Sequence, residues 1–72
     1  MKTVKDLPSN PTICQLMEVA YNEGLEGHIM ISTELDQLID DTFSIADMTA
    51  RGRIWDAHAN GWADYRTEVE AF

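Results

Sequence analysis

The stretch STELDQLIDDTFSIAD, from Ser32 to Asp47, carries the clearest fold signal in the chain. Three apolar side chains and one threonine recur in it at three- and four-residue spacing, at Leu35, Leu38, Ile39 and Thr42. That spacing places them on one face of an α-helix. Thr33 is predicted to cap the helix, with Asp36 three residues later as its reciprocal partner. The stretch therefore predicts an amphipathic helix as a central element of the fold.

A second helix is predicted before this stretch. Asn10 is the expected N-cap and Pro11 the first helical residue, where the missing N–H of proline costs nothing. An apolar face follows at helical spacing, from Ile13, Leu16, Met17 and Ala20. Gly24 and Gly27 are expected to end this helix in a turn. Residues 1–9 are expected to form a flexible arm.

The segment HIMIS, from His28 to Ser32, joins the two predicted helices. Its β-branched isoleucines are compatible with a short strand, but a single strand needs a partner. Thr3–Leu7 is the one candidate for that pairing. The segment is therefore expected to be an extended linker, or at most half of a two-strand pairing.

The last third of the chain has the rhythm of a long helix. Ser44 and Asp47 repeat the capping signal, so a new helix is expected to begin there, with Phe43 packed at the junction. Heptad a and d intervals separate Met48, Trp55, His58, Trp62, Tyr65, Val69 and Phe72. Asn60-Gly61 is a typical turn dipeptide, which predicts a bend or a restart. We interpret the stripe as core; the alternative is a coiled-coil seam that forms a homodimer.

Length and composition indicate one domain over residues 1–72. The chain has 44% hydrophobic residues, which is too many for a disordered tail. The expected fold is mainly α, a small bundle of three to four short helices, with the two-strand pairing as an open addition. The single cysteine, Cys14, excludes an internal disulfide and is predicted to be a small buried apolar residue. It also indicates a reducing compartment.

The charge is strongly and unevenly negative. The formal net charge is −8, and the nine acidic residues between Asp6 and Ala50 have no Lys or Arg among them. Such a field repels nucleic acids and anionic membranes and attracts basic protein surfaces. No signal peptide and no membrane-spanning run of about 20 apolar residues is recognisable. We therefore expect a cytoplasmic protein of a bacterial host cell that binds neither nucleic acid nor membrane directly.

No catalytic, metal or cofactor motif is present. His28 and His58 are the only side chains with ordinary titration near neutrality. His28 follows a glycine turn and is expected to be exposed, whereas His58 is expected to be half-buried in the aromatic stripe. Cys14 and the two histidines lack zinc-ligand spacing. We therefore predict no enzymatic activity, no metal site and no cofactor.

The acidic residues are the strongest functional signal. Glu34 to Asp41 span a rise of about 10 Å along a helix, so their four carboxylates follow one another at roughly 3.5 Å, close to the spacing of about 3.4 Å per phosphate in a DNA strand. A generic acidic surface is the alternative interpretation. The predicted partner-binding residues are Glu34, Asp36, Asp40, Asp41, Asp47, Glu23 and Glu26, with help from Glu18. Trp55, Trp62 and Tyr65 are the predicted apolar anchors.

The segment AYNEGLEGHIMI, from Ala20 to Ile31, resembles the opening motif of ArdA-type antirestriction proteins. The likeness rests on Tyr21, Asn22, Gly24, Gly27 and Ile31, with the second glycine displaced by one position. The resemblance implies an acidic phage or mobile-element protein that blocks a defence enzyme by imitating DNA. It also implies a strand at His28–Ser32.

Two functional hypotheses follow. The first is a small acidic anti-defence inhibitor, of the DNA-mimic type, that occupies the basic nucleic-acid-contacting surface of a defence or transcription protein. The second is a non-enzymatic helical adaptor or structural protein. It would act through the aromatic heptad stripe, either as a homodimer or docked on a partner helix.

Overall fold

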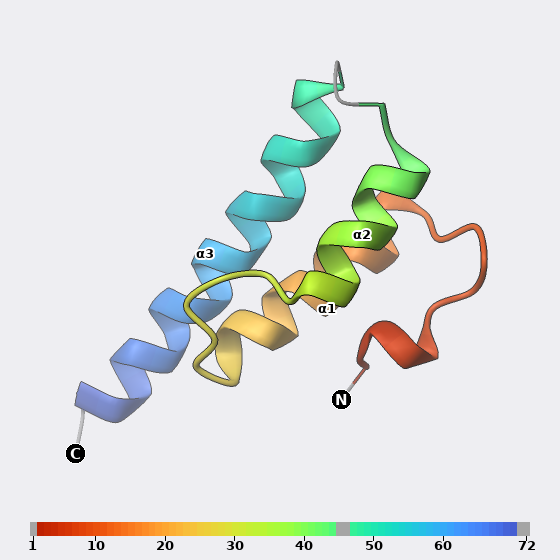
Figure 1. The fold of residues 1–72 in the computed structure, drawn as a ribbon. Helices are drawn as coiled ribbons and strands as arrows, with labels where there is room; N and C mark the ends of the chain where they lie inside the picture. The colour runs from red at the N-terminus through yellow and green to blue at the C-terminus, as the bar shows by residue number, and fades with distance from the viewer. Residues whose placement is uncertain (1, 45–46, 71–72) are drawn as a thin grey trace.

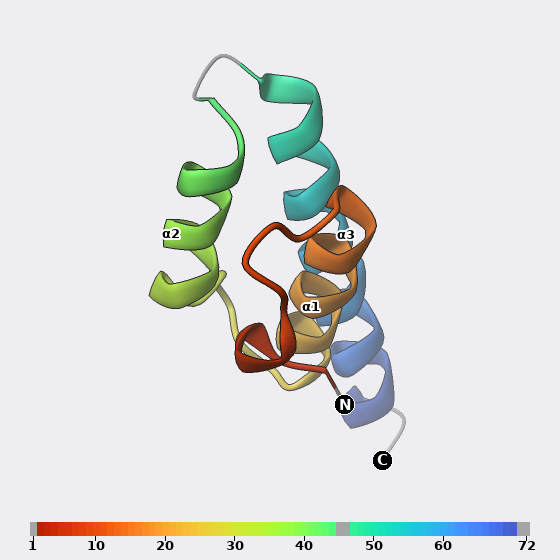
Figure 2. The ribbon, with the colours of Figure 1, turned by 90° about the vertical axis from the view of Figure 1, so that its right-hand side faces the viewer.

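The computed structural model describes residues 2–44 and 47–70, and this part of the chain contains three α-helices. A short 3-10 turn, η1 (Val4–Asp6), precedes α1 (Ile13–Leu25), α2 (Thr33–Thr42) and α3 (Met48–Glu70). The chain runs along α1, returns along α2 and turns again into α3, so α1 and α3 are parallel (Figures 1 and 2). The predicted mainly α bundle is confirmed.

The segment His28–Ser32 is an irregular connection between α1 and α2. None of the residues 2–44 and 47–70 forms a strand, so the two-strand alternative is not adopted. Thr3–Leu7, the segment predicted to pair with it, instead contains η1. There the Thr3 backbone N–H donates to Asp6 Oδ2 at 2.9 Å. The backbone carbonyl of Lys2 accepts a hydrogen bond from Asn22 Nδ2 at 3.0 Å, which attaches this N-terminal segment to α1.

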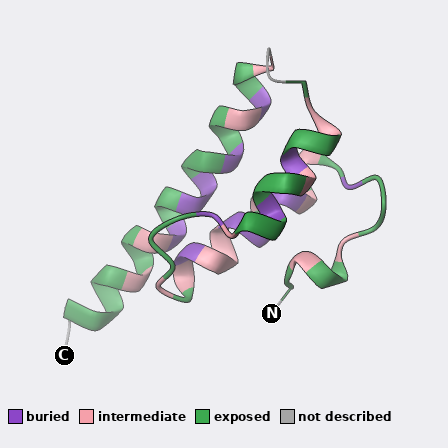
Figure 3. Cartoon of the chain, in the orientation of Figure 1, coloured by how far each residue is buried: buried purple, intermediate pink, exposed green. Residues whose placement is uncertain are grey.

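The core lies where the inner faces of the three helices meet (Figure 3). Its buried members are Leu16, Val19, Ala20, Ile31, Leu35, Ile39, Ile54 and Ala57. Each fully buried Leu or Ile contributes roughly 1.5–3 kcal/mol. Two of them, Leu35 and Ile39, hold α2 in place, and Leu38 and Phe43 pack partly buried against the same cluster. The predicted apolar face of α2 and the packing of Phe43 at the junction are therefore confirmed.

The helices α1 and α3 touch at two glycines. A Cβ added at Gly24 would lie 2.6 Å from the Trp62 backbone nitrogen, and one added at Gly61 would clash with the Tyr21 carbonyl. Two predictions are wrong here, because α1 continues through Gly24 to Leu25 and α3 continues through Asn60-Gly61. Both glycines allow a close backbone approach. Gly27, at φ 93°, is the glycine that supplies the turn.

The helix caps differ from the predicted ones by a few residues. Thr12 caps α1, in place of Asn10: its Oγ1 accepts from Gln15 N at 3.2 Å, and Gln15 Oε1 accepts from Thr12 N at 2.8 Å. This reciprocal capping box satisfies two helix-end donors at once, which Asn10 before Pro11 does not. Ser32, in place of Thr33, caps α2.

The third helix begins later than the Ser44 signal suggests. Its first residue is Met48, and Asp47 Oδ1 accepts a hydrogen bond from Ala50 N at 3.1 Å, as an N-cap side chain does. Asp47 therefore supplies the cap that was predicted from Ser44.

Of the six described positions of the aromatic stripe, three are exposed, two are partly buried and one is buried, so the interpretation of the whole stripe as core is wrong. Met48, Trp55 and Val69 are exposed, whereas the buried positions of α3 are Ala50, Ile54, Ala57, His58 and Gly61. Three of these five buried residues are alanine or glycine, and at Gly61 the backbone of α1 leaves no room for a side chain. His58 alone of the stripe is buried, and Phe72 lies outside the described residues. Cys14 was predicted to be buried and is exposed on α1.

Candidate functional site: an acidic helix beside an apolar groove

Four exposed carboxylates cover the solvent side of α2. They belong to Glu34, Asp36, Asp40 and Asp41, and α2 contains no Lys or Arg. At 100° per residue, Asp36 and Asp40 lie on one edge of the exposed half, and Glu34 and Asp41 lie on the other. The predicted acidic face is therefore present as two edges rather than one line. Within residues 2–44 and 47–70, Asp40 is the only one of the four in an ion pair.

Arg51 neutralises part of this surface. Its Nη1 lies 2.8 Å from Asp40 Oδ1, while Nη2 donates to the Phe43 carbonyl at 3.1 Å and Nε donates to the Ser44 carbonyl at 3.2 Å. A cation at the C-terminal end of a helix also stabilises its unpaired carbonyls. The acidic stretch has no Lys or Arg of its own, but Asp40 is neutralised by a cation from outside that stretch. Its partner lies eleven residues away in sequence and is brought close by the turn into α3.

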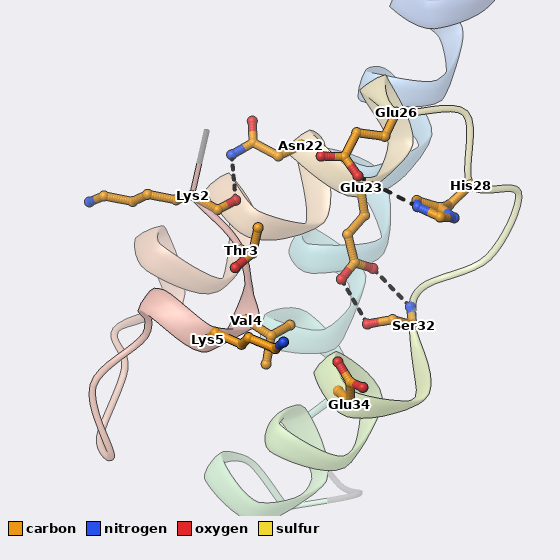
Figure 4. Close-up of a pocket in the computed structure, with 10 residues that line it drawn as sticks. All are labelled: Lys2, Thr3, Val4, Lys5, Asn22, Glu23, Glu26, His28, Ser32 and Glu34. Atoms are coloured by element: carbon orange, nitrogen blue, oxygen red, sulfur yellow. Dashed lines mark hydrogen bonds and ion pairs between the residues drawn. The ribbon is translucent and has the colours of Figure 1, made fainter.

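Three other predicted partner-binding acids have structural roles in the fold. Glu23 accepts from the Ser32 backbone N–H at 2.8 Å and from its hydroxyl at 2.7 Å (Figure 4). Glu26 lies 3.5 Å from His28 Nε2, and Asp47 caps α3. His28 is exposed, as predicted. These three acids therefore contact the linker or a helix end. Among residues 2–44 and 47–70, the carboxylates of α2 outside any ion pair are Glu34, Asp36 and Asp41, and Asp41 accepts a hydrogen bond from Gln37 Nε2 at 3.3 Å.

A polar hollow of about 380 Å³ lies between the N-terminal segment, α1 and the start of α2 (Figure 4). Lys2, Lys5, Glu23 and Glu34 line it from several sides. Two hydroxyls of this hollow lie beside carboxylates: Thr3 Oγ1 donates to Asp6 Oδ2 at 3.3 Å, and Ser32 Oγ donates to Glu23 Oε2 at 2.7 Å. The Ser32 oxygen also accepts from Leu35 N at 3.2 Å. Because capping uses that oxygen, Ser32 is not arranged as a nucleophile.

The predicted aromatic anchors surround a different surface. Trp55 is 41% exposed, and its ring meets the His58 ring edge-on, at 6.2 Å between centroids. Trp62 is partly buried beneath the Arg66 guanidinium, which lies 4.9 Å from the ring centroid. The Tyr65 ring packs against Gly27 and is also partly buried. Of the three predicted anchors, Trp55 is therefore the most available.

Sequence reasoning missed the linker's contribution to this surface. Ile29 is 77% exposed and Met30 is 68% exposed. Ile29 lines an open apolar groove of about 340 Å³ together with Trp55, His58, Ala59 and Trp62. The signal was the IMI run itself, which is more apolar than a connecting loop requires.

His58 is the one buried polar side chain among the described residues that lacks a hydrogen bond. The residue is 3% exposed, and its Nε2 has no partner. An unpaired polar atom in a core costs roughly 1–3 kcal/mol. The prediction of a half-buried packing histidine understated its burial.

A wider hollow of about 700 Å³ separates the outer edges of α1 and α3. Ile13, Met17 and the exposed Cys14 line it from α1, and Arg53, Asp56 and Ala57 line it from α3. It combines apolar surface with one cation, Arg53, and two acids, Glu18 and Asp56.

Residues 2–44 and 47–70 contain neither a candidate metal cluster nor a candidate membrane-spanning helix. No group of three or more His, Cys, Asp or Glu side chains is placed to hold a metal ion. No helix combines the length and the apolar character that crossing a bilayer requires.

Comparisons with known proteins identify no relative of this chain. The resemblance to ArdA-type proteins therefore stays a prediction from Tyr21, Asn22, Gly24, Gly27 and Ile31. No family model, no curated protein and no solved structure matches the chain.

Proposed function

We propose that this protein is a small acidic inhibitor that binds the basic, nucleic-acid-contacting surface of a defence or transcription protein. The observation that carries the proposal is the exposed face of α2. It holds Glu34, Asp36 and Asp41 outside any ion pair within the described residues, on a helix without a single cation. A groove lined with Lys and Arg attracts a fixed array of negative charge, which speeds association.

The distribution of cations supports the same conclusion. Lys2, Arg51 and Arg66 are each paired with an acid of this chain, at Glu18, Asp40 and Glu70. With a net charge of −8, the remaining carboxylates dominate the long-range field. Burial of Leu35 and Ile39 attaches α2 to the core, which reduces the ordering of the acidic face that binding requires.

The experiment is capture of binding proteins from a bacterial lysate on the immobilised chain. Washing with salt from about 0.05 M to about 1 M should release the partners, because screening shortens the range of charge attraction. Duplex DNA should displace them in competition at low salt. Retention that is unchanged across the salt series would contradict the proposal.

A pair of charge-matched variants locates the contact. Asp36→Asn with Asp41→Asn removes two charges from α2, and Asp56→Asn with Glu68→Gln removes two exposed charges from α3. We expect the first pair to weaken capture much more than the second. Equal losses would indicate a general acidic surface rather than recognition through α2.

A second function, an adaptor that works through the aromatic stripe of α3, is favoured by the exposure of Met48, Trp55 and Val69. In this case the chain forms a homodimer or docks on a partner helix by apolar contact. Light scattering separates the two functions. A dimer that dissociates on Trp55→Ala but persists in the Asp36→Asn, Asp41→Asn variant would favour the adaptor.

A further inference from the structure

The groove at Trp55 has a shape that can accept a helix. Trp55, Ala59 and Trp62 follow one another on α3 at spacings of four and three, so they form a row along the helix axis. The row extends over about 10 Å, or two helical turns. Ile29 from the linker forms the facing wall. An amphipathic helix presents its apolar side chains at the same spacing, and it docks into grooves of this kind.

The fold does not need the exposed part of this surface. Ile29 and Met30 are largely exposed and are not among the residues of the core cluster. Single exposed apolar residues are ordinary, but a cluster of them beside a hollow marks a contact site. Two adjacent exposed apolar side chains in the seven-residue connection 26–32 therefore indicate a contact partner outside the chain.

Charge identifies the kind of partner. Arg51 lies one turn before Trp55 on α3 and is paired with Asp40 of α2. Arg66 lies over the Trp62 ring and is paired with Glu70, so each of these two cations beside the groove is already neutralised by an acid of this chain. Asp36 lies one turn before Asp40 on the same edge and is in no ion pair within the described residues. A second copy of this chain would bring another net charge of −8 to the same place. A basic segment is therefore favoured over self-association.

Resting on the proposed function, we propose that the partner contributes a cationic amphipathic helix. One large apolar side chain of that helix sits in the groove between Ile29 and Trp55, and its lysines or arginines meet Asp36 and the rest of the α2 face. The groove then selects which basic surface is bound, while the carboxylates supply attraction. Charge imitation alone lacks such a selection step.

The test uses two synthetic peptides that contain only lysine and leucine in equal proportions. In the first, the leucines recur at three- and four-residue spacing and form one apolar face; in the second, the same residues are rearranged so that no face exists. Binding is followed by the fluorescence of Trp55 and Trp62. We expect the first peptide to bind at least about tenfold more tightly, the factor for removing one aliphatic side chain from water.

Two exposed substitutions locate the contact. Ile29→Ser should remove the preference for the first peptide, whereas Val69→Ser, an exposed apolar position of α3 that does not line the groove, should preserve it. Equal affinity for both peptides, with no effect of Ile29→Ser, would overturn the groove proposal. If that equal binding still weakened with salt and on Asp36→Asn, the charge-based function would stand without it.

Two other outcomes are also decisive. Absence of binding by either peptide at low salt would count against both the groove and the proposed function. Sedimentation that reveals a dimer of the free chain, abolished by Ile29→Ser, would assign the groove to a second copy and would overturn the basic-helix proposal.

Discussion

Gly24 of α1 and Gly61 of α3 lie against each other's helix backbone, and neither position has room for a Cβ atom. Gly61→Ala should therefore lower the free energy of unfolding by at least about 3 kcal/mol, because the clash is with backbone that cannot rotate away. Urea denaturation followed by circular dichroism measures the change.

Gly52→Ala is the matched control on the same helix. A Cβ at Gly52 would meet nothing within 4 Å. The substitution should raise stability by about 0.5–1 kcal/mol through the better helix propensity of alanine. The same change in the free energy of unfolding for Gly61→Ala and Gly52→Ala would contradict the close approach of α1 and α3.

Arg51 connects the end of α2 to the start of α3 through Asp40 and the carbonyls of Phe43 and Ser44. Arg51→Lys keeps the charge but cannot reproduce three contacts from one planar group. We expect a loss of about 1–2 kcal/mol in the free energy of unfolding. The exposed Arg53→Lys should change it by less than about 0.5 kcal/mol. Equal, small effects of both changes in thermal melts would show that the Arg51 contacts do not stabilise the fold.

The hydroxyl of Tyr21 donates a hydrogen bond to Asp64 Oδ2, which joins α1 to α3. This bond, assisted by desolvation and by the negative charge of Asp64, raises the pKa of Tyr21 above its ordinary value. Because the folded-state pKa is the higher one, the contribution to stability is fully present below the ordinary tyrosine pKa. It is lost as the pH rises through the raised value.

An ultraviolet absorbance titration of tyrosinate measures this shift. Tyr21→Phe identifies the signal of Tyr21 by difference, and Asp64→Asn removes the negative charge while leaving an acceptor. In Asp64→Asn, the pKa of Tyr21 should return toward its ordinary value. Identical titration curves for Asp64→Asn and the unmodified protein would contradict the assignment.

The unpaired Nε2 of His58 predicts an unusual substitution. His58→Leu replaces a buried polar ring with an apolar side chain, so the free energy of unfolding should stay unchanged or rise by up to about 1 kcal/mol. Chemical denaturation at neutral pH provides the measurement. A loss of more than about 1 kcal/mol would indicate that Nε2 has a hydrogen-bond partner in solution.

The sequence predicted the helices well because their periodicity is a local property. The face of Leu35 and Ile39 appears where expected, and so does its acidic opposite side. The predicted caps of α1 and α2 were one or two residues away from the observed ones, because more than one residue near each helix start can act as a cap. At α2, Glu23 holds Ser32 by two hydrogen bonds and thereby favours it over Thr33. That choice depends on a tertiary contact and is invisible in local sequence.

Glycine was the main source of error about the fold. A turn and a close helix crossing both favour glycine. The sequence alone therefore does not tell which of the two Gly24 and Gly61 serve. The misplaced stripe on α3 follows from the same contact, since a helix crossing at this distance buries alanine and glycine and leaves tryptophan outside. The groove at Ile29 was missed because it forms only when the linker lies beside α3.

The backbone contact between α1 and α3 has a consequence for how such a protein can diversify. At Gly24 and Gly61 the contact between α1 and α3 is backbone against backbone, and α2 is held against this pair of helices mainly by Leu35 and Ile39. Descendants of this chain can therefore exchange the outward-facing residues of α2 freely while they keep Gly24 and Gly61. We expect homologues to retain the two glycines and to vary more at the outward-facing residues of α2.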